Sequence, residues 1–81
     1  AMAKPVAELV AHLAGKPRGG GSDKELAGVV GAWLKRRQDL LDEGLGEEAL
    51  EAVRAELRGR GCGDPDRFIQ GVQKNLGRTG T

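Results

Sequence analysis

The chain of 81 residues is long enough for one small domain, and 38% hydrophobic with 31% charged residues is typical of a folded protein. Its net charge of +1 gives no general attraction to nucleic acid or anionic lipid, and no apolar run approaches the ~20 residues that cross a membrane. Aromatic residues make up only 2% of the chain and β-branched residues are scarce, which disfavours strands. We therefore expect an all-α fold without a membrane span.

The first predicted helix covers residues 4–14. It follows an Ala-Met-Ala start at residues 1–3 that we interpret as a vector remnant ahead of an excised fragment. Pro5 suits the first helical turn, where a missing N–H costs no hydrogen bond. The triple glycine at residues 19–21 predicts a flexible connector, because the phosphate-binding pattern that would give it another role is missing. The sequence leaves open whether this loop is native or engineered.

The second predicted helix, residues 22–43, is the longest and gives the shorter helices a surface to pack against. Ser22 and Glu25 fit a capping box, in which each side chain accepts a hydrogen bond from the other residue's backbone N–H. Gly44 predicts the helix end, with Leu45 folding back on the last turn as in a Schellman motif. The apolar stripe of this helix consists of Leu26, Val29, Val30, Trp33, Leu34, Leu40 and Leu41.

Two shorter helices follow, at residues 47–59 and 64–77. A cluster of glycines breaks the chain between them, and the Asp64-Pro65 pair predicts a restart with Asp64 as the N-cap and Pro65 in the first turn. The four segments therefore predict a small four-helix bundle with glycine-rich loops.

We expect one helical domain over residues 4–77, followed by a flexible tail at residues 78–81. One core in a chain of this size seldom contributes more than ~3–5 kcal/mol of stability, so self-association or a partner would add to it. The predicted core consists of Val6, Leu9, Val10, Leu13, Leu26, Val30, Trp33, Leu34, Leu41, Leu50, Val53, Leu57, Phe68, Ile69, Val72 and Leu76.

The sequence does not predict an enzyme. His12 is the only histidine and Cys62 the only cysteine, and nothing in the sequence places the two side chains together as a nucleophile and its base. A zinc site needs several such ligands, so we expect neither a metal nor a cofactor. One cysteine excludes an internal disulfide and fits a reducing compartment, from which we expect an intracellular location.

Trp33 and Arg37 carry the first functional hypothesis. Either Trp33 anchors the core while Arg37 extends over it to water, or the two form a half-exposed cation–π patch of the residue types enriched at binding hot spots. The second interpretation predicts a non-catalytic docking module of a larger protein, whose partner is another protein, such as one presenting an amphipathic helix. The predicted contact residues are Trp33, Arg36, Arg37 and Leu40.

The alternative hypothesis is a nucleic-acid-binding module, because separated cations on one surface can meet phosphates. Interspersed carboxylates argue for a mixed, solvated face instead. The coarse helical layout is similar to that of several recognition modules, including the PWI type of nucleic-acid-binding bundle, although no motif transfers a residue role. The candidate cations are Lys35, Arg36, Arg54, Arg58, Arg60, Arg67 and Lys74.

Overall fold

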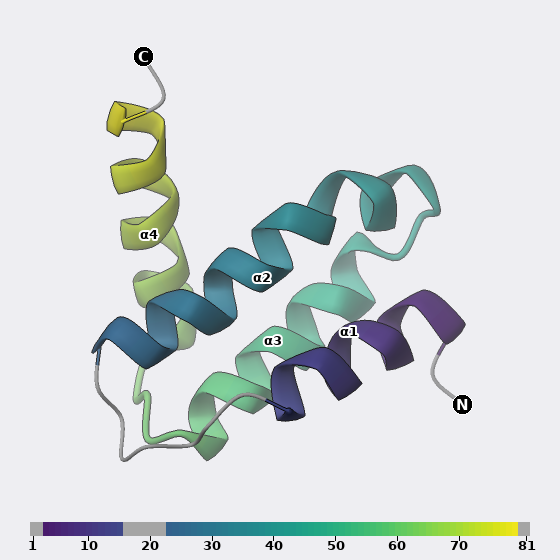
Figure 1. Cartoon of the computed structure of the whole chain (residues 1–81), viewed down its shortest axis with the longest axis horizontal. Helices are drawn as coiled ribbons and strands as arrows, with labels where there is room; N and C mark the ends of the chain where they lie inside the picture. Colours follow the sequence, from purple (N-terminus) through teal and green to yellow (C-terminus); the bar gives the residue numbers. More distant parts are fainter. Residues whose placement is uncertain (1–2, 16–22, 80–81) are drawn as a thin grey trace.

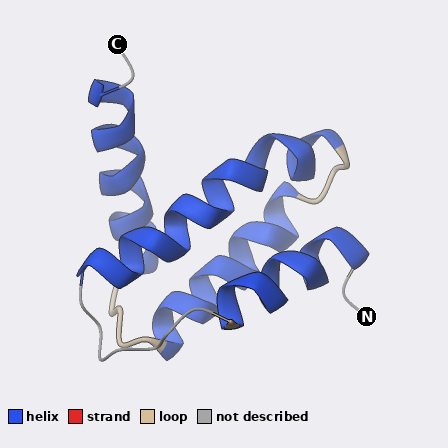
Figure 2. Ribbon diagram, viewed as in Figure 1, coloured by secondary structure: helices blue, strands red, loops and turns tan. Residues whose placement is uncertain are grey.

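The computed structural model describes residues 3–15 and 23–79, with side chains to residue 75. Within these ranges the chain forms four α-helices and no strand, which confirms the predicted four-helix, all-α fold (Figures 1 and 2). Residues 1–2, the triple glycine and Ser22 of the predicted capping box lie outside the described residues. The helices are α1 (Lys4–Ala14), α2 (Asp23–Asp42), α3 (Gly46–Gly59) and α4 (Pro65–Thr79).

The molecule is flat, with extents of 32 × 30 × 19 Å, so its thin dimension is about two helix diameters. Figure 1 shows α1 and α3 running in one direction and α2 in the opposite direction, with α3 behind the other two in this view. The fourth helix, α4, stands at a steep angle to this trio, and its C-terminal part projects from it. Most of the buried apolar residues therefore come from α1, α2 and α3, and only Ile69 comes from α4.

The core contains the predicted inward face of each helix, with exceptions at a few positions. Val29 and Ala49 join the core, and several residues predicted there are half-buried against it. The side chain of Leu76, also predicted in the core, lies outside the described residues. Leu41 was predicted in the core but is 46% exposed, whereas Leu40 is only 1% exposed. Leu40 follows Trp33 by seven residues, which is close to two full turns, while Leu41 lies a further ~100° around the helix. The buried apolar residues are Val6, Leu9, Leu13, Leu26, Val29, Val30, Trp33, Leu40, Ala49, Val53, Leu57 and Ile69.

The end of α2 is the predicted Schellman motif. The Leu45 N–H donates to the Leu40 carbonyl at 2.7 Å, and the Gly44 N–H donates to the Leu41 carbonyl at 3.0 Å. Gly44 has a φ of +77°, a conformation that side-chain-bearing residues adopt only with strain. This motif turns the chain sharply and brings the start of α3 under the last turn of α2.

The end of α3 uses the same device. The Cys62 N–H donates to the Leu57 carbonyl and the Gly61 N–H to the Arg58 carbonyl, both at 3.0 Å, with a φ of +94° at Gly61. The chain then restarts as predicted.

At the start of α4, the Asp64 carboxylate accepts a hydrogen bond from the Arg67 N–H at 3.2 Å. Pro65 occupies the first turn of the helix. The helix continues to Thr79, past the end predicted at residue 77, so the first two residues of the predicted tail are helical.

Candidate functional site

Trp33 and Arg37 form the predicted cation–π pair. They lie one turn apart on α2, and the Arg37 guanidinium carbon is 5.7 Å from the centroid of the Trp33 ring. Trp33 is only 5% exposed, so its ring belongs to the core and Arg37 covers its outer side. The structure thus matches the core-anchor interpretation of Trp33 and leaves Arg37, not the indole, exposed at the surface.

Two hollows lie beside this pair. The hollow at the Leu41 end has a volume of about 200 Å³ and is lined by α2 and α3, and the hollow at the α4 end has a volume of about 350 Å³ and is lined by α2, α3 and α4. They share Trp33, Arg37 and Leu50, and we call the two together the Arg37 trough. The other lining residues are Leu40, Leu41, Gly46 and Glu47 at the Leu41 end, and Arg54, Asp66, Ile69, Gln70 and Gln73 at the α4 end.

Leu41 replaces Leu40 as the exposed apolar residue of the site. Among the described side chains it is the only large hydrophobic one that is exposed, at 46%. Gly46, the first residue of α3, makes its position possible, because a Cβ built on Gly46 would overlap the Leu41 Cδ2 atom. The two leucines adjoin in sequence and both fit the apolar stripe, so sequence reasoning placed them the wrong way round.

Of the two arginines that line the trough, Arg54 is paired with described carboxylates and Arg37 is not. The Arg37 guanidinium forms no ion pair with any described carboxylate, although Glu47 lines the Leu41 end of the trough. At the α4 end, Arg54 bonds to the carboxylates of Asp66 and Glu51, and these hydrogen bonds, led by that of Asp66, raise the pKa of Arg54. Arg54 therefore holds α3 against α4, and Arg37 is the cation of the trough that remains available to a ligand.

Arg36 lies outside the trough, although it was predicted as a contact residue. Its guanidinium is 3.6 Å from the Glu8 carboxylate of α1, and its Nε atom is buried without a hydrogen-bond partner. Arg36 thus links α2 to α1.

Arg60 was predicted among the surface cations, and this placement is wrong. Its side chain is 2% exposed. One guanidinium nitrogen donates to the Leu13 carbonyl at 2.8 Å, and the group pairs with Glu56 at 3.1 Å. The carbonyl belongs to the last turn of α1, where helical carbonyls lack helical partners, so Arg60 caps α1 from the end of α3.

The other candidate cations are exposed and come from three different helices, so no single helix presents them. These residues are Lys35 on α2, Arg58 on α3, and Arg67 and Lys74 on α4.

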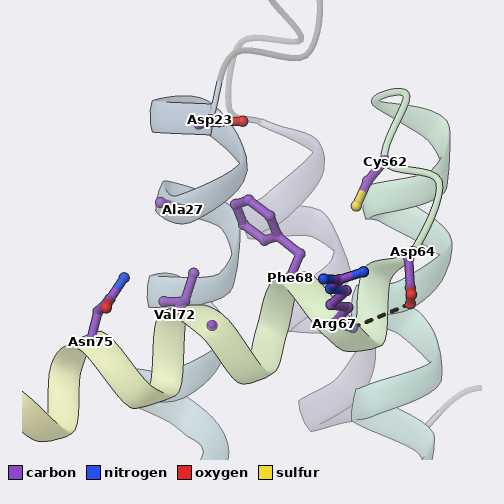
Figure 3. Close-up of a pocket in the computed structure, with 9 residues that line it drawn as sticks. Asp23, Ala27, Cys62, Asp64, Arg67, Phe68, Val72 and Asn75 are labelled. Carbon is purple, nitrogen blue, oxygen red and sulfur yellow. Dashed lines mark hydrogen bonds between the residues drawn. The ribbon is translucent and has the colours of Figure 1, made fainter.

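A second hollow, the α2/α4 groove, lies on another side of α4 and was not predicted (Figure 3). It has a volume of about 530 Å³, and Figure 3 shows Phe68 and Val72 of α4 pointing toward Ala27 of α2. Gly71 adds open space, since a Cβ there would meet nothing within 4 Å, and this glycine inside a helical pattern is the sequence signal that was overlooked. The remaining lining residues are Asp23, Cys62, Asp64, Arg67 and Asn75.

Cys62 and His12, the candidate nucleophile and base, line no common hollow among the described residues. Cys62 lines the α2/α4 groove, while His12 is exposed on α1 and lines neither the groove nor the trough. Across residues 3–15 and 23–79, no group of three or more His, Cys, Asp or Glu side chains is placed to hold a metal ion. In the same ranges, none of the helices combines the length and apolar character needed to cross a membrane.

Comparison with known proteins gives no family for this chain. No protein-family model, no curated protein and no solved structure matches it. A function is therefore inferred from the geometry of the trough.

Proposed function

We propose that the chain is a non-catalytic docking module that binds a segment of another protein in the Arg37 trough. The observation that supports this most is the state of Arg37. Its guanidinium is exposed and has no described ion-pair partner, and it lies over a buried tryptophan beside the exposed Leu41. Arginine is one of the residue types enriched at interface hot spots.

Stacking on Trp33 prepares Arg37 for binding. A free arginine side chain has ~2 kcal/mol of rotamer entropy to lose when it is fixed in a complex. The Trp33 ring restricts Arg37 before a ligand arrives, so less of this cost falls on the binding step. Beside it, burying an apolar side chain of the partner against Leu41 and Leu50 would contribute ~1.5–3 kcal/mol.

The same geometry gives the nucleic-acid alternative less support. Three of its candidate cations are already engaged: Arg36 with Glu8, Arg54 with two carboxylates, and Arg60 inside the protein. Phosphate binding needs several free cations that follow one strand or groove. We also propose a reducing, intracellular setting, which the single half-buried thiol of Cys62 supports.

A capture experiment with matched variants tests the proposal. The wild-type chain, Leu41→Ser, Arg37→Gln and the control Ala11→Ser would be immobilised and exposed to a lysate of the source cells, with and without nuclease treatment. Ala11 is exposed on α1 and lines neither hollow. Docking in the trough predicts a set of proteins retained by wild type and control but reduced about tenfold by each trough variant, equivalent to ~1.4 kcal/mol.

Circular dichroism would first establish that all four chains have the same helix content. Proteins retained equally by all four chains would refute docking in the trough. Binding that disappears on nuclease treatment, or collapses between ~50 and ~200 mM salt, would favour the nucleic-acid alternative.

A further inference from the structure

We infer that the trough recognises an acidic amphipathic segment, in which a carboxylate lies one helical turn from a bulky aliphatic side chain. This inference rests on the proposed docking function and specifies the chemistry of its partner. The charges and the apolar surface of the trough supply two independent parts of the argument.

The charge of Arg37 selects a carboxylate. Each neighbouring guanidinium is already matched: Arg36 by Glu8, and Arg54 by Asp66 and Glu51. Arg37 is held by an aromatic face alone, so its planar set of N–H donors is left for a ligand. A carboxylate fits this donor set with two parallel hydrogen bonds, which a neutral or cationic side chain does not form.

The apolar part of the trough lies one turn further along α2. Leu41 follows Arg37 by four residues, a rise of about 6 Å, and Leu50 of α3 lines the same hollow. A helical partner presents residues three or four positions apart at the same spacing along one face. A partner helix that carries Asp or Glu one turn before or after Leu, Ile or Phe can therefore contact Arg37 and the apolar surface at the same time.

Glu47 fixes which end of the trough takes the carboxylate. It lines the Leu41 end, where it would repel an acidic side chain. At the opposite end, the Asp66 carboxylate is paired with Arg54, and Gln70 and Gln73 of α4 are uncharged and can hydrogen-bond to either a donor or an acceptor. The partner's acidic residue therefore belongs at Arg37 and its aliphatic residue beside Leu41, with any basic residue near Glu47.

A selection from displayed peptides tests this chemistry without knowledge of the natural partner. A random library of helical peptides would be selected in parallel on the wild-type chain, on Arg37→Glu and on Arg58→Glu. Arg58 is an exposed arginine of α3 that lines neither hollow of the trough, so its variant controls for a general change of charge. The wild type should enrich Asp or Glu one turn from Leu, Ile or Phe. Arg37→Glu should enrich Lys or Arg at the acidic position, and Arg58→Glu should behave as wild type.

The affinity of a selected peptide then provides a quantitative check. Arg37→Gln should weaken it about tenfold to a hundredfold, in line with the loss of a charge-assisted hydrogen-bond pair. Unfolding curves would verify that the variants remain folded. Enriched peptides without an acidic residue, or the same acidic peptides on Arg37→Glu, would overturn the inference while docking itself survives. A library that yields no enrichment on the wild-type chain would instead count against the proposed function.

Discussion

Both α2 and α3 end in a Schellman motif, yet the arginine near each end has different surroundings. At the end of α3, Arg60 is enclosed by the Glu56 carboxylate and the Leu13 carbonyl. Toward the end of α2, Arg37 has the Trp33 ring on one side and solvent on the other. The comparison teaches that partners decide the role of an arginine: a carboxylate and a carbonyl make it part of the fold, whereas an aromatic ring alone leaves it available to a ligand.

The largest effect that separates the two ends is expected from Arg60→Ala. It would remove the guanidinium that pairs with Glu56 and donates to the Leu13 carbonyl in a mostly buried site, and breaking a buried pair in this way costs ~3–5 kcal/mol. That cost is comparable to the whole stability expected of a chain this size, so the variant should lose most of its helix signal at 25 °C. Urea unfolding followed by circular dichroism measures the change.

Arg58→Ala is the matched control, since Arg58 is exposed and two residues away on the same helix. We expect a change within ~0.5 kcal/mol. If Arg60→Ala were as stable as Arg58→Ala, the structural role assigned to Arg60 would be wrong.

A smaller loss of stability, similar for both Schellman motifs, is expected when the glycine of either motif is replaced. Gly44→Ala and Gly61→Ala each place a Cβ at positive φ, which costs roughly 1–2 kcal/mol. Gly28→Ala should change stability in the opposite direction, by up to ~1 kcal/mol, because Gly28 lies inside α2 and a Cβ there meets open space. Thermal unfolding of the three variants checks both signs, and a stabilised Gly44 or Gly61 variant would contradict the left-handed turns.

The smallest effect on stability is expected from Gly46→Ala, which should nevertheless change the trough. The new Cβ meets only the flexible end of the Leu41 side chain, so the leucine moves aside and the free energy of unfolding changes by less than ~1 kcal/mol. Methyl NMR would show the Leu41 signals shifted, while those of the buried Leu57 stay in place. Unchanged Leu41 signals would mean that Gly46 does not shape the trough.

The two helix ends also differ in how well they could be predicted from the sequence. Spacings of only a few residues determine the helices, the helix ends at glycines and the Trp33–Arg37 pair. These features could therefore be predicted. The burial of Arg60 could not, because its acceptor, Leu13, lies 47 residues earlier in the chain. A cation in the last turn of a helix normally stays in water and complements the helix dipole, and nothing local distinguishes Arg60 from Arg58 in this respect.

The candidate site was predictable on one side only. Local periodicity places Trp33 and Arg37 on one stripe, but Leu40 and Leu41 both fit that stripe within the tolerance of a helical period. The α4 wall of the trough, with Gln70 and Gln73, depends on the angle at which α4 crosses the other helices. Packing between distant segments sets this angle, and so it has no local signature in the sequence.

The position of Trp33 has a practical consequence for spectroscopy. The chain has one tryptophan and no tyrosine, so nearly all of its near-ultraviolet fluorescence comes from the floor of the trough. A ligand that moves the Arg37 guanidinium away from the indole, or excludes water from the Arg37 trough, would change the tryptophan emission without any attached dye. Trp33 can thus report ligand binding in the Arg37 trough through its own fluorescence.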